Sequence, residues 1–262
     1  MKLMVQFGTK KMKMDIEEGM TLGIFKYLLS EQFGIEQDLI VLSVLNKHIN
    51  AFDDETVESV GIKNMTMVRV LLLNDLEKSV KQGTGHDGYI PLIDKTKFVT
   101  VRRPMPGDNS CLFHCLEYLF YNKSTQDPSH IRKEVAEIVK LYPQKFTTDY
   151  LGQPNSLYCL NIVEPNTWGS NVEISIYSFL KECQIIVFDL ENNLDVTYGE
   201  KSLNRCAFII FTGNHFDVLC LTQSLTSPPS EDKVLFNNTD KSVKDKMKSY
   251  IQSEHPNFRF TF

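Results

Sequence analysis

The chain has no apolar run long enough to cross a membrane. Its longest runs, such as residues 39–45, are far shorter than the roughly 20 residues that a bilayer-spanning helix needs. The first residues lack the apolar region of a signal peptide, and the formal net charge is −5 at pH 7. We therefore expect a cytoplasmic protein without membrane insertion. The acidic balance also argues against a basic nucleic-acid-binding surface.

Cysteine is scarce and irregularly spaced. None of the 6 cysteines forms a CxxC pair, and none follows Cys220. This spacing excludes a regular disulfide framework, and it leaves no evident zinc site. Several of the cysteines fall in apolar stretches, which is typical of reduced thiols in a reducing compartment. We expect neither a metal nor a cofactor.

The apolar content, by contrast, is sufficient for real cores. Of the 262 residues, 42% are hydrophobic, which allows one domain of ordinary size plus a small one. The pattern of strands and helices predicts the α+β class. It divides the chain into four regions: a first domain (1–73), a linker (74–97), a larger domain (98–222) and a C-terminal linker with a short helix (223–262).

The first region follows the order ββαββ. Alternating apolar residues predict a hairpin around Gly8, and Thr21 is placed to cap a helix that runs from Leu22 and stops at Gly34. Residues 39–45 and 65–73 read as further strands, with a small turn at 55–60 before the last one. In residues 74–97 the regular spacing of apolar residues is lost and glycines appear among charged residues, which predicts a flexible linker.

Asp108-Asn109-Ser110-Cys111-Leu112-Phe113 places a thiol at a predicted helix start. The residues before Cys111 can cap, and apolar residues recur at helical spacing after it. Unpaired N–H groups and the positive end of the helix dipole predict a lowered pKa for this thiol. The alternative is an inert buried cysteine that merely begins a core helix.

The position of one histidine favours a reactive Cys111 over an inert one. Residues 205–211 and 215–221 read as two strands joined by the turn Thr212-Gly213-Asn214. Because side chains alternate across a strand, His215 and Asp217 project to the same face. The carboxylate can hold the imidazole in one tautomer, so nucleophile, base and orienting group can all be named.

These residues closely resemble two signatures of the ovarian tumour (OTU) family of cysteine deubiquitinases. The family's Cys loop reads Asp-x-x-Cys-Leu-Phe and its His loop reads His-aromatic-Asp, and both are intact here. A third stretch, residues 168–176, resembles the family's Trp-Gly-Gly-x-(Ile/Val)-Glu helix start, with Ser170 in place of the second glycine. A glycine can be replaced harmlessly where its φ is negative. The resemblance implies a papain-like OTU fold with helices around a mostly antiparallel sheet.

It also implies hydrolysis at the C-terminus of ubiquitin, with ubiquitin and polyubiquitin chains as partners. Cys111 would attack the isopeptide carbonyl, His215 would protonate the departing amine, and Asp217 would orient His215. Backbone N–H groups of the loop Asp108, Asn109, Ser110 and Cys111 would stabilise the oxyanion. Asp108 counts as an active-site residue in the family but is equally placed to cap the helix. Candidates for the substrate cleft are Trp168, Gly169, Asn214 and Phe216, although a lone Trp is more often core.

The first region resembles a ubiquitin-like β-grasp, and its place ahead of an OTU domain is similar to the UBX-like module of one OTU subfamily. That resemblance implies docking on a hexameric AAA unfoldase, valosin-containing protein, in protein quality control, endoplasmic-reticulum-associated degradation (ERAD) and the unfolded protein response. Lys47, His48 and Ile49 are the docking loop expected from position. The alternative is an unspecialised stability cap.

Relatives in that subfamily carry a zinc finger at the C-terminus. This chain keeps a polar helix, expected at 242–253, but has no cysteine there, so we predict no structural zinc.

Two other functions stay open. One is a catalytically silent ubiquitin-binding adaptor of the unfoldase. The other is a thiol protease of ordinary peptides. The intact Asp108, Cys111, His215 and Asp217 disfavour the first, and the ubiquitin-like first region disfavours the second.

Overall fold

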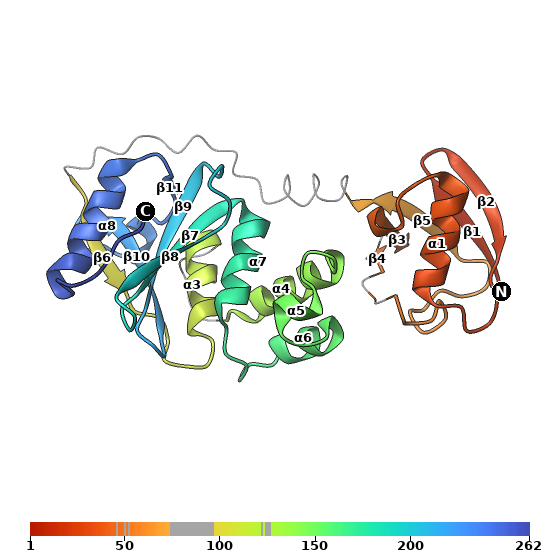
Figure 1. Cartoon of the computed structure of the whole chain (residues 1–262), viewed down its shortest axis with the longest axis horizontal. Helices are drawn as coiled ribbons and strands as arrows, with labels where there is room; N and C mark the ends of the chain where they lie inside the picture. The colour runs from red at the N-terminus through yellow and green to blue at the C-terminus, as the bar shows by residue number, and fades with distance from the viewer. Residues whose placement is uncertain (46, 50, 52, 74–96, 122, 124–126) are drawn as a thin grey trace. The chain divides into compact units, whose positions relative to one another are not determined.

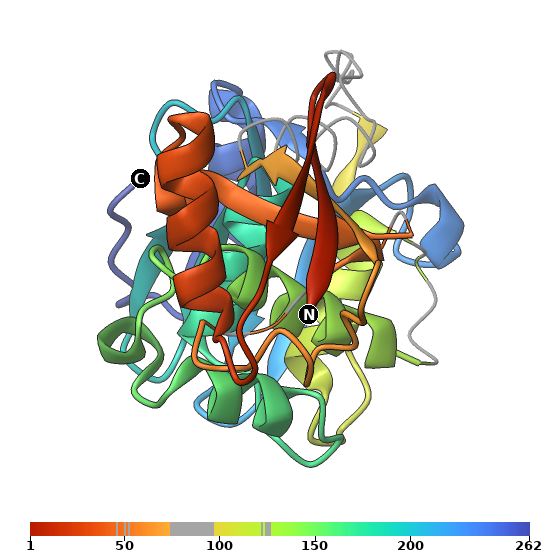
Figure 2. The ribbon, with the colours of Figure 1, turned by 90° about the vertical axis from the view of Figure 1, so that its right-hand side faces the viewer.

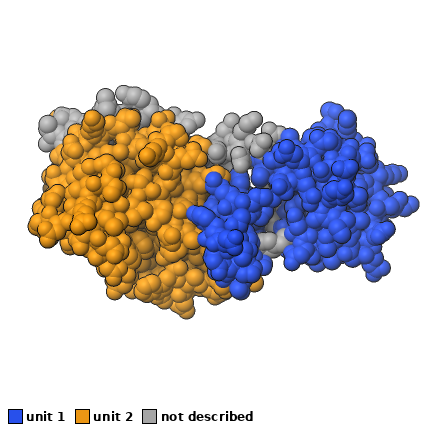
Figure 3. Space-filling model, viewed as in Figure 1, with its two compact units in different colours: residues 1–85, 137–157 blue, residues 86–136, 158–262 orange. Residues whose placement is uncertain are grey.

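The computed structural model describes the whole chain except residues 46, 50, 52, 74–96, 122 and 124–126. The chain separates into two compact units, residues 1–85 with 137–157 and residues 86–136 with 158–262 (Figure 3). The predicted linker, 74–97, lies outside the described residues except for Lys97.

The N-terminal region forms a five-stranded mixed sheet with one long helix (Figure 2). The strand order is β2-β1-β5-β3-β4, and the central strands β1 and β5 are parallel. The elements are β1 (Lys2–Phe7), β2 (Lys10–Asp15), α1 (Leu22–Phe33), β3 (Ile40–Val44), β4 (Lys47–His48) and β5 (Met67–Leu72). The predicted hairpin, helix and later strands are confirmed. The short strand β4 corrects one expectation, because Lys47 and His48 of the expected docking loop pair with β3 instead.

Local signals explain this helix well. The Thr21 hydroxyl accepts a hydrogen bond from the Ile24 N–H at 3.4 Å, and Gly34 ends the helix at φ 66°, where a residue without Cβ is unstrained. Leu22, Phe25 and Leu29 of α1 are buried in a core shared with the strands. Burial of this apolar stripe stabilises the unit.

The second sheet is mostly antiparallel, as expected. Its order is β6-β10-β9-β7-β8, with β11 paired to β9, and along this path only β7 and β9 are parallel. The strands are β6 (Val99–Arg103), β7 (Cys183–Asp189), β8 (Leu194–Tyr198), β9 (Arg205–Phe211), β10 (Phe216–Thr222) and β11 (Phe236–Asn237). The helices are α3 (Cys111–Phe120), α4 (Ser129–Leu141), α5 (Thr148–Leu151), α6 (Asn155–Ile162), α7 (Asn171–Lys181) and α8 (Lys241–Glu254).

Helices cover both faces of this sheet. One face packs against α8, which contributes Val243, Met247 and Ile251 to a buried aromatic and aliphatic core. Helices α3 and α7 lie on the opposite side of the sheet (Figure 1). This layering brings the start of α3 next to strand β10, which matters for the site below.

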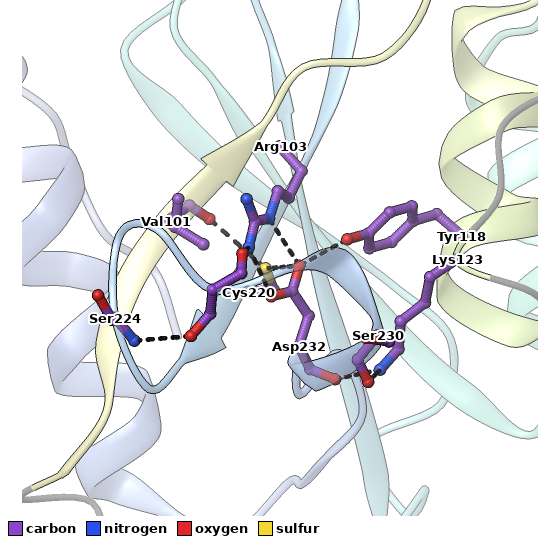
Figure 4. A network of polar contacts seen from close by, with 9 residues as sticks. Val101, Arg103, Tyr118, Lys123, Cys220, Ser224, Ser230 and Asp232 are labelled. Carbon is purple, nitrogen blue, oxygen red and sulfur yellow. Dashed lines mark hydrogen bonds and ion pairs between the residues drawn. The ribbon is translucent and has the colours of Figure 1, made fainter.

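The C-terminal tail belongs to this core. The expected polar helix is confirmed as α8, but its apolar stripe at i, i+4 and i+8 is buried. Asp232 also ties the tail to three elements (Figure 4). Its carboxylate accepts hydrogen bonds from the Arg103 guanidinium at 2.7 and 2.8 Å, from Tyr118 Oη at 2.5 Å and from Cys220 Sγ at 3.3 Å. Burial by itself raises the pKa of Asp232, but these donors outweigh it and lower the pKa overall.

Two further findings concern expectations from sequence. Residues 147–165, which lack clear periodicity, contain the short helices α5 and α6 rather than a plain loop. Within the described part of the chain, no helix is both long and apolar enough to cross a bilayer.

Candidate active site

Cys111 is the first residue of helix α3, as predicted. The loop before it is shaped by Asp108, whose Oδ1 accepts the Ser110 N–H at 2.8 Å and whose Oδ2 accepts from His114 Nε2 at 3.0 Å. Burial works to raise the pKa of Asp108, but the hydrogen bonds from His114 and Ser110 prevail and lower it. Asp108 is therefore an ionised carboxylate whose two oxygens are both used within the Cys loop.

The His loop is a tight turn between β9 and β10. The Thr212 N–H donates to the His215 carbonyl at 3.0 Å, and Gly213 has φ 96°, which a side chain rarely tolerates. Strand β10 begins at Phe216, one residue later than predicted, so His215 directly precedes the strand rather than opening it. Its Nε2–H donates to Asp217 Oδ1 at 3.1 Å, so the expected pairing of His215 with Asp217 is confirmed.

Asp217 is itself held rigidly. It is buried, its Oδ1 also accepts the Met105 N–H at 2.7 Å, and its Oδ2 accepts from Arg102 Nε at 2.7 Å. A buried carboxylate with this many donors is fixed in direction. It can therefore hold the imidazole of His215 in one tautomer and orientation.

The packing of α3 on β10 places the Cys111 thiol against the His loop. The sulfur accepts hydrogen bonds from the backbone N–H groups of Phe216 and Leu112, and Phe216 stands between His215 and Asp217. Burial nevertheless raises the pKa of Cys111 above its ordinary value and outweighs both donors. The expectation of a lowered pKa is therefore wrong for this state, because a helix start inside a packed interface is also desolvated.

Cys111 still differs from the other thiols of the chain. All six cysteines are free, and Cys111 is the one that is partly exposed, while the remaining five are buried. Burial raises the pKa of Cys206 to about 12 and that of Cys115 well above the ordinary range. A reactive thiol is accordingly available at one position.

The segment that precedes α7 lies beside the Cys loop. Trp168 is 62% exposed, and its indole N–H donates to Asn109 Oδ1 at 2.6 Å. A Cβ at Gly169 would lie 2.7 Å from Leu112 Cδ2, so this glycine allows the segment to approach α3 closely. Ser170 has φ −137° and forms a capping box with Glu173, so the missing second glycine costs no backbone strain.

The remaining cleft candidates lie on the His loop. The Phe216 ring packs on Phe211 with centroids 4.6 Å apart. Asn214 is exposed, and its Oδ1 accepts from Thr212 Oγ1 at 3.5 Å. Asn214 therefore contacts its own turn, whereas Trp168 contacts the Cys loop.

Sequence reasoning missed two arginines that hold these loops. Arg102 pairs with Asp217, and buried Arg132 of α4 donates to the Asn109 carbonyl at 3.2 Å and to Ser110 Oγ at 2.8 Å. One signal was available for Arg132, which falls in the apolar stripe of α4 with Ala136 and Val139, both buried. A charged residue in such a stripe has a buried partner.

No group of three or more potential metal ligands occurs among the described residues. The groups assembled at this site are the Cys111 thiol, an imidazole, two carboxylates and backbone N–H donors. This arrangement is suited to nucleophilic acyl transfer with a general base.

Comparison with known proteins agrees with this chemistry. Residues 106–216 match the family described as OTU-like cysteine protease. The chain is 32% identical over 161 residues to "Ubiquitin thioesterase OTU1" of Dictyostelium discoideum, covering 61% of this chain and 50% of that protein. It is 30% identical over 125 residues to "OVARIAN TUMOR DOMAIN-containing deubiquitinating enzyme 2" of Arabidopsis thaliana, covering 47% of this chain and 60% of that protein.

A solved structure shares the fold as well. "Structure of Ovarian Tumor (OTU) domain in complex with Ubiquitin" superposes with a TM-score of 0.51 at 26% identity, covering 62% of this chain and 92% of that one. By contrast, the chain spans only half to three fifths of the length of the two curated relatives above.

Proposed function

We propose that the chain is a deubiquitinase of the OTU family, on the premise that residues 106–216 match the family described as OTU-like cysteine protease. It hydrolyses isopeptide and thioester bonds at the C-terminus of ubiquitin. One observation carries the proposal: the Cys111 sulfur accepts a hydrogen bond from the backbone N–H of Phe216, the residue that stands in sequence between His215 and its partner Asp217. The names of two relatives and the ubiquitin complex of a similar structure support ubiquitin as the substrate.

His215 acts as the general base. The raised pKa of Cys111 leaves the thiol protonated at neutral pH, so a neighbouring group has to remove its proton before attack. With Nε2–H bound to Asp217, Nδ1 is the ring nitrogen that is left to accept that proton. The imidazolium then protonates the departing lysine amine, and water hydrolyses the thioester by the same route.

The oxyanion is stabilised by backbone N–H groups of the Cys loop. The Ser110 N–H already donates to Asp108, which removes it from this role. The N–H groups of Asn109 and Cys111 have no hydrogen-bond partner within the described residues, so we assign them to the oxyanion. Asp108 acts by shaping the loop, because both of its oxygens are engaged there.

A ubiquitin probe with a C-terminal electrophile tests the function. The full chain should form a covalent adduct at Cys111, and Cys111→Ala should lose polyubiquitin cleavage by at least about 1,000-fold. Cys159→Ala, which removes a buried thiol, is the matched control. Ubiquitin binding without labelling would instead support the silent adaptor, and cleavage of unrelated peptides alone would support an ordinary thiol protease.

We further propose that the N-terminal region is a ubiquitin-like, UBX-like module that docks on a hexameric AAA unfoldase, valosin-containing protein, in ERAD and protein quality control. The sheet order, with its central parallel pair, supports a β-grasp. Leu45 between β3 and β4 is 91% exposed, next to the docking residues Lys47, His48 and Ile49. The six free thiols support a cytoplasmic location.

Pull-down with the purified unfoldase tests this module. Leu45→Asp should abolish binding, and Met65→Asp, at another exposed apolar residue of the same region, should leave it intact. Equal binding by both variants would place the contact elsewhere.

A further inference from the structure

Arg132 is a buried cation whose direct contacts are not with carboxylates, although the charges of buried Glu173 and of Asp108 act on it at longer range. It is 2% exposed, and its guanidinium carbon lies 3.8 Å from the centroid of the Phe113 ring. Within the described residues no carboxylate forms an ion pair with it. Its donors go instead to neutral oxygens. A desolvated guanidinium is costly, so these contacts have to compensate for that burial.

Those contacts join two segments that are far apart in sequence. Arg132 Nη2 donates to the Asn109 carbonyl at 3.2 Å, to Ser110 Oγ at 2.8 Å and to the Pro165 carbonyl at 3.0 Å. Nη1 donates to the Ile162 carbonyl at 3.1 Å. The planar fork of arginine can satisfy several acceptors at once in this way, whereas the single ammonium of lysine cannot reproduce the geometry.

The same two segments are also linked through the Asn109 side chain. Its Oδ1 accepts from the Trp168 indole at 2.6 Å, and its Nδ2 donates to Asn166 Oδ1 at 3.2 Å. The two segments are thus linked on the buried side by Arg132 and on the exposed side by Trp168.

The consequence concerns one peptide plane, that between Asn109 and Ser110. Its carbonyl accepts from Arg132, and its N–H donates to Asp108 Oδ1 at 2.8 Å. Rotation of this plane would break both of these hydrogen bonds, so it is opposed from the carbonyl side and from the N–H side. The two N–H groups that flank the plane are those of Asn109 and Cys111, the donors assigned above to the oxyanion.

We propose that Arg132 is a positioning residue that fixes the Asn109–Ser110 peptide and thereby preorganises the N–H groups that bind the oxyanion. The proposal rests on the proposed function for the identity of the reaction. Arg132 touches no substrate, so it acts on the transition state through the loop rather than on ubiquitin binding.

Steady-state hydrolysis of a ubiquitin C-terminal fluorogenic amide by the full chain tests it. Arg132→Lys and Arg132→Met should each lower kcat by about 100-fold and change KM by less than about three-fold, because the lost interaction operates only in the transition state. Lys133→Met, which removes an exposed cation from the next position of α4, should leave both constants unchanged. Alkylation of Cys111 by iodoacetamide builds no oxyanion and should slow by less than about ten-fold in Arg132→Lys.

The outcomes of these measurements distinguish failure of the role of Arg132 from failure of the proposed function. Wild-type kcat in Arg132→Lys would overturn the proposal. So would activity that falls only in proportion to the folded fraction seen by thermal unfolding, because Arg132 would then act through stability alone. Hydrogen exchange of the Ser110 amide, whose N–H is bonded to Asp108, needs no ubiquitin and should be faster in Arg132→Lys. Faster exchange in a chain that does not cleave ubiquitin would sink the proposed function but retain the role of Arg132, and unchanged exchange would sink that role.

Discussion

At the scale of single residues, the protonation of Cys111 is decided by two opposing effects. Backbone N–H groups of Leu112 and Phe216 favour the thiolate, and burial favours the thiol. Burial is the larger effect, which is why the proposed mechanism has His215 remove the proton when the reaction begins. The helix start alone could not predict this outcome, because burial depends on the packing of α3 against β10.

The sign of this shift predicts how alkylation of Cys111 varies with pH. Because the pKa is raised, the thiolate forms only above the ordinary thiol value of about 8.5, and less is present at pH 7 than in a free cysteine. The iodoacetamide rate, followed by peptide-resolved mass spectrometry, should therefore be below that of free cysteine at pH 7 and should rise into the alkaline range. A rate that is already at its plateau below pH 7 would indicate a preformed thiolate–imidazolium pair instead.

Asp217 serves two purposes that mutation can separate. It orients His215, and it neutralises Arg102. Asp217→Asn should lower kcat strongly and also destabilise the fold by about 3 kcal/mol, because a cation loses its buried partner. Adding Arg102→Gln should restore part of the stability but none of the activity, as measured by thermal unfolding and ubiquitin-amide hydrolysis. Recovery of both together would mean that Asp217 supports activity through stability only.

At the scale of elements, close approach of the Trp168 segment to α3 depends on Gly169. Gly169→Ala places a Cβ 2.7 Å from Leu112 Cδ2 and 3.0 Å from the Phe113 ring, so α3 or the segment has to move. We expect a stability loss of about 1–3 kcal/mol together with lower activity. Ser170→Gly should cost only a few tenths of a kcal/mol, because glycine is a tolerable N-cap. Denaturant unfolding of both variants measures the difference, and equal losses would contradict it.

Elements with local signals could be predicted from sequence, and those without could not. The Gly213 turn, the start of α3 and the helix after Thr21 each rest on residues within one turn of one another. Strand β6 was not predicted, and its arginines bond carboxylates more than 100 positions away, so their roles exist only in the folded sheet. Arg132 likewise bonds carbonyl oxygens, which leave no sequence signature.

At the scale of the whole molecule, the C-terminal tail is part of the folded unit that contains the proposed site. The region expected from sequence ended at Thr222, yet α8 lies in the same core as strands β7, β9 and β10, and Asp232 bonds Arg103 of β6. The residues named around Cys111 all fall between 102 and 217. The chemistry and the stability of this unit therefore come from different stretches of the chain.

Two fragments test this division. Residues 98–262 should hydrolyse a ubiquitin amide within about three-fold of the full chain, because they contain every site residue named above. Residues 98–222 should fail to give a cooperative unfolding transition, because Arg103 loses its buried partner and the apolar face that α8 covers becomes exposed. Full activity and a cooperative transition in 98–222 would show that the tail is dispensable.

The distribution of the six cysteines has a practical consequence. Five are sealed in the interior and Cys111 alone is accessible, so a colorimetric thiol titration should count one sulfur in the native chain and six after denaturation. The number of accessible thiols in the native chain therefore measures how much of a preparation is intact. Thiol-specific oxidants that reach the folded chain would meet Cys111 before any other thiol, so loss of that single count would report loss of the proposed nucleophile.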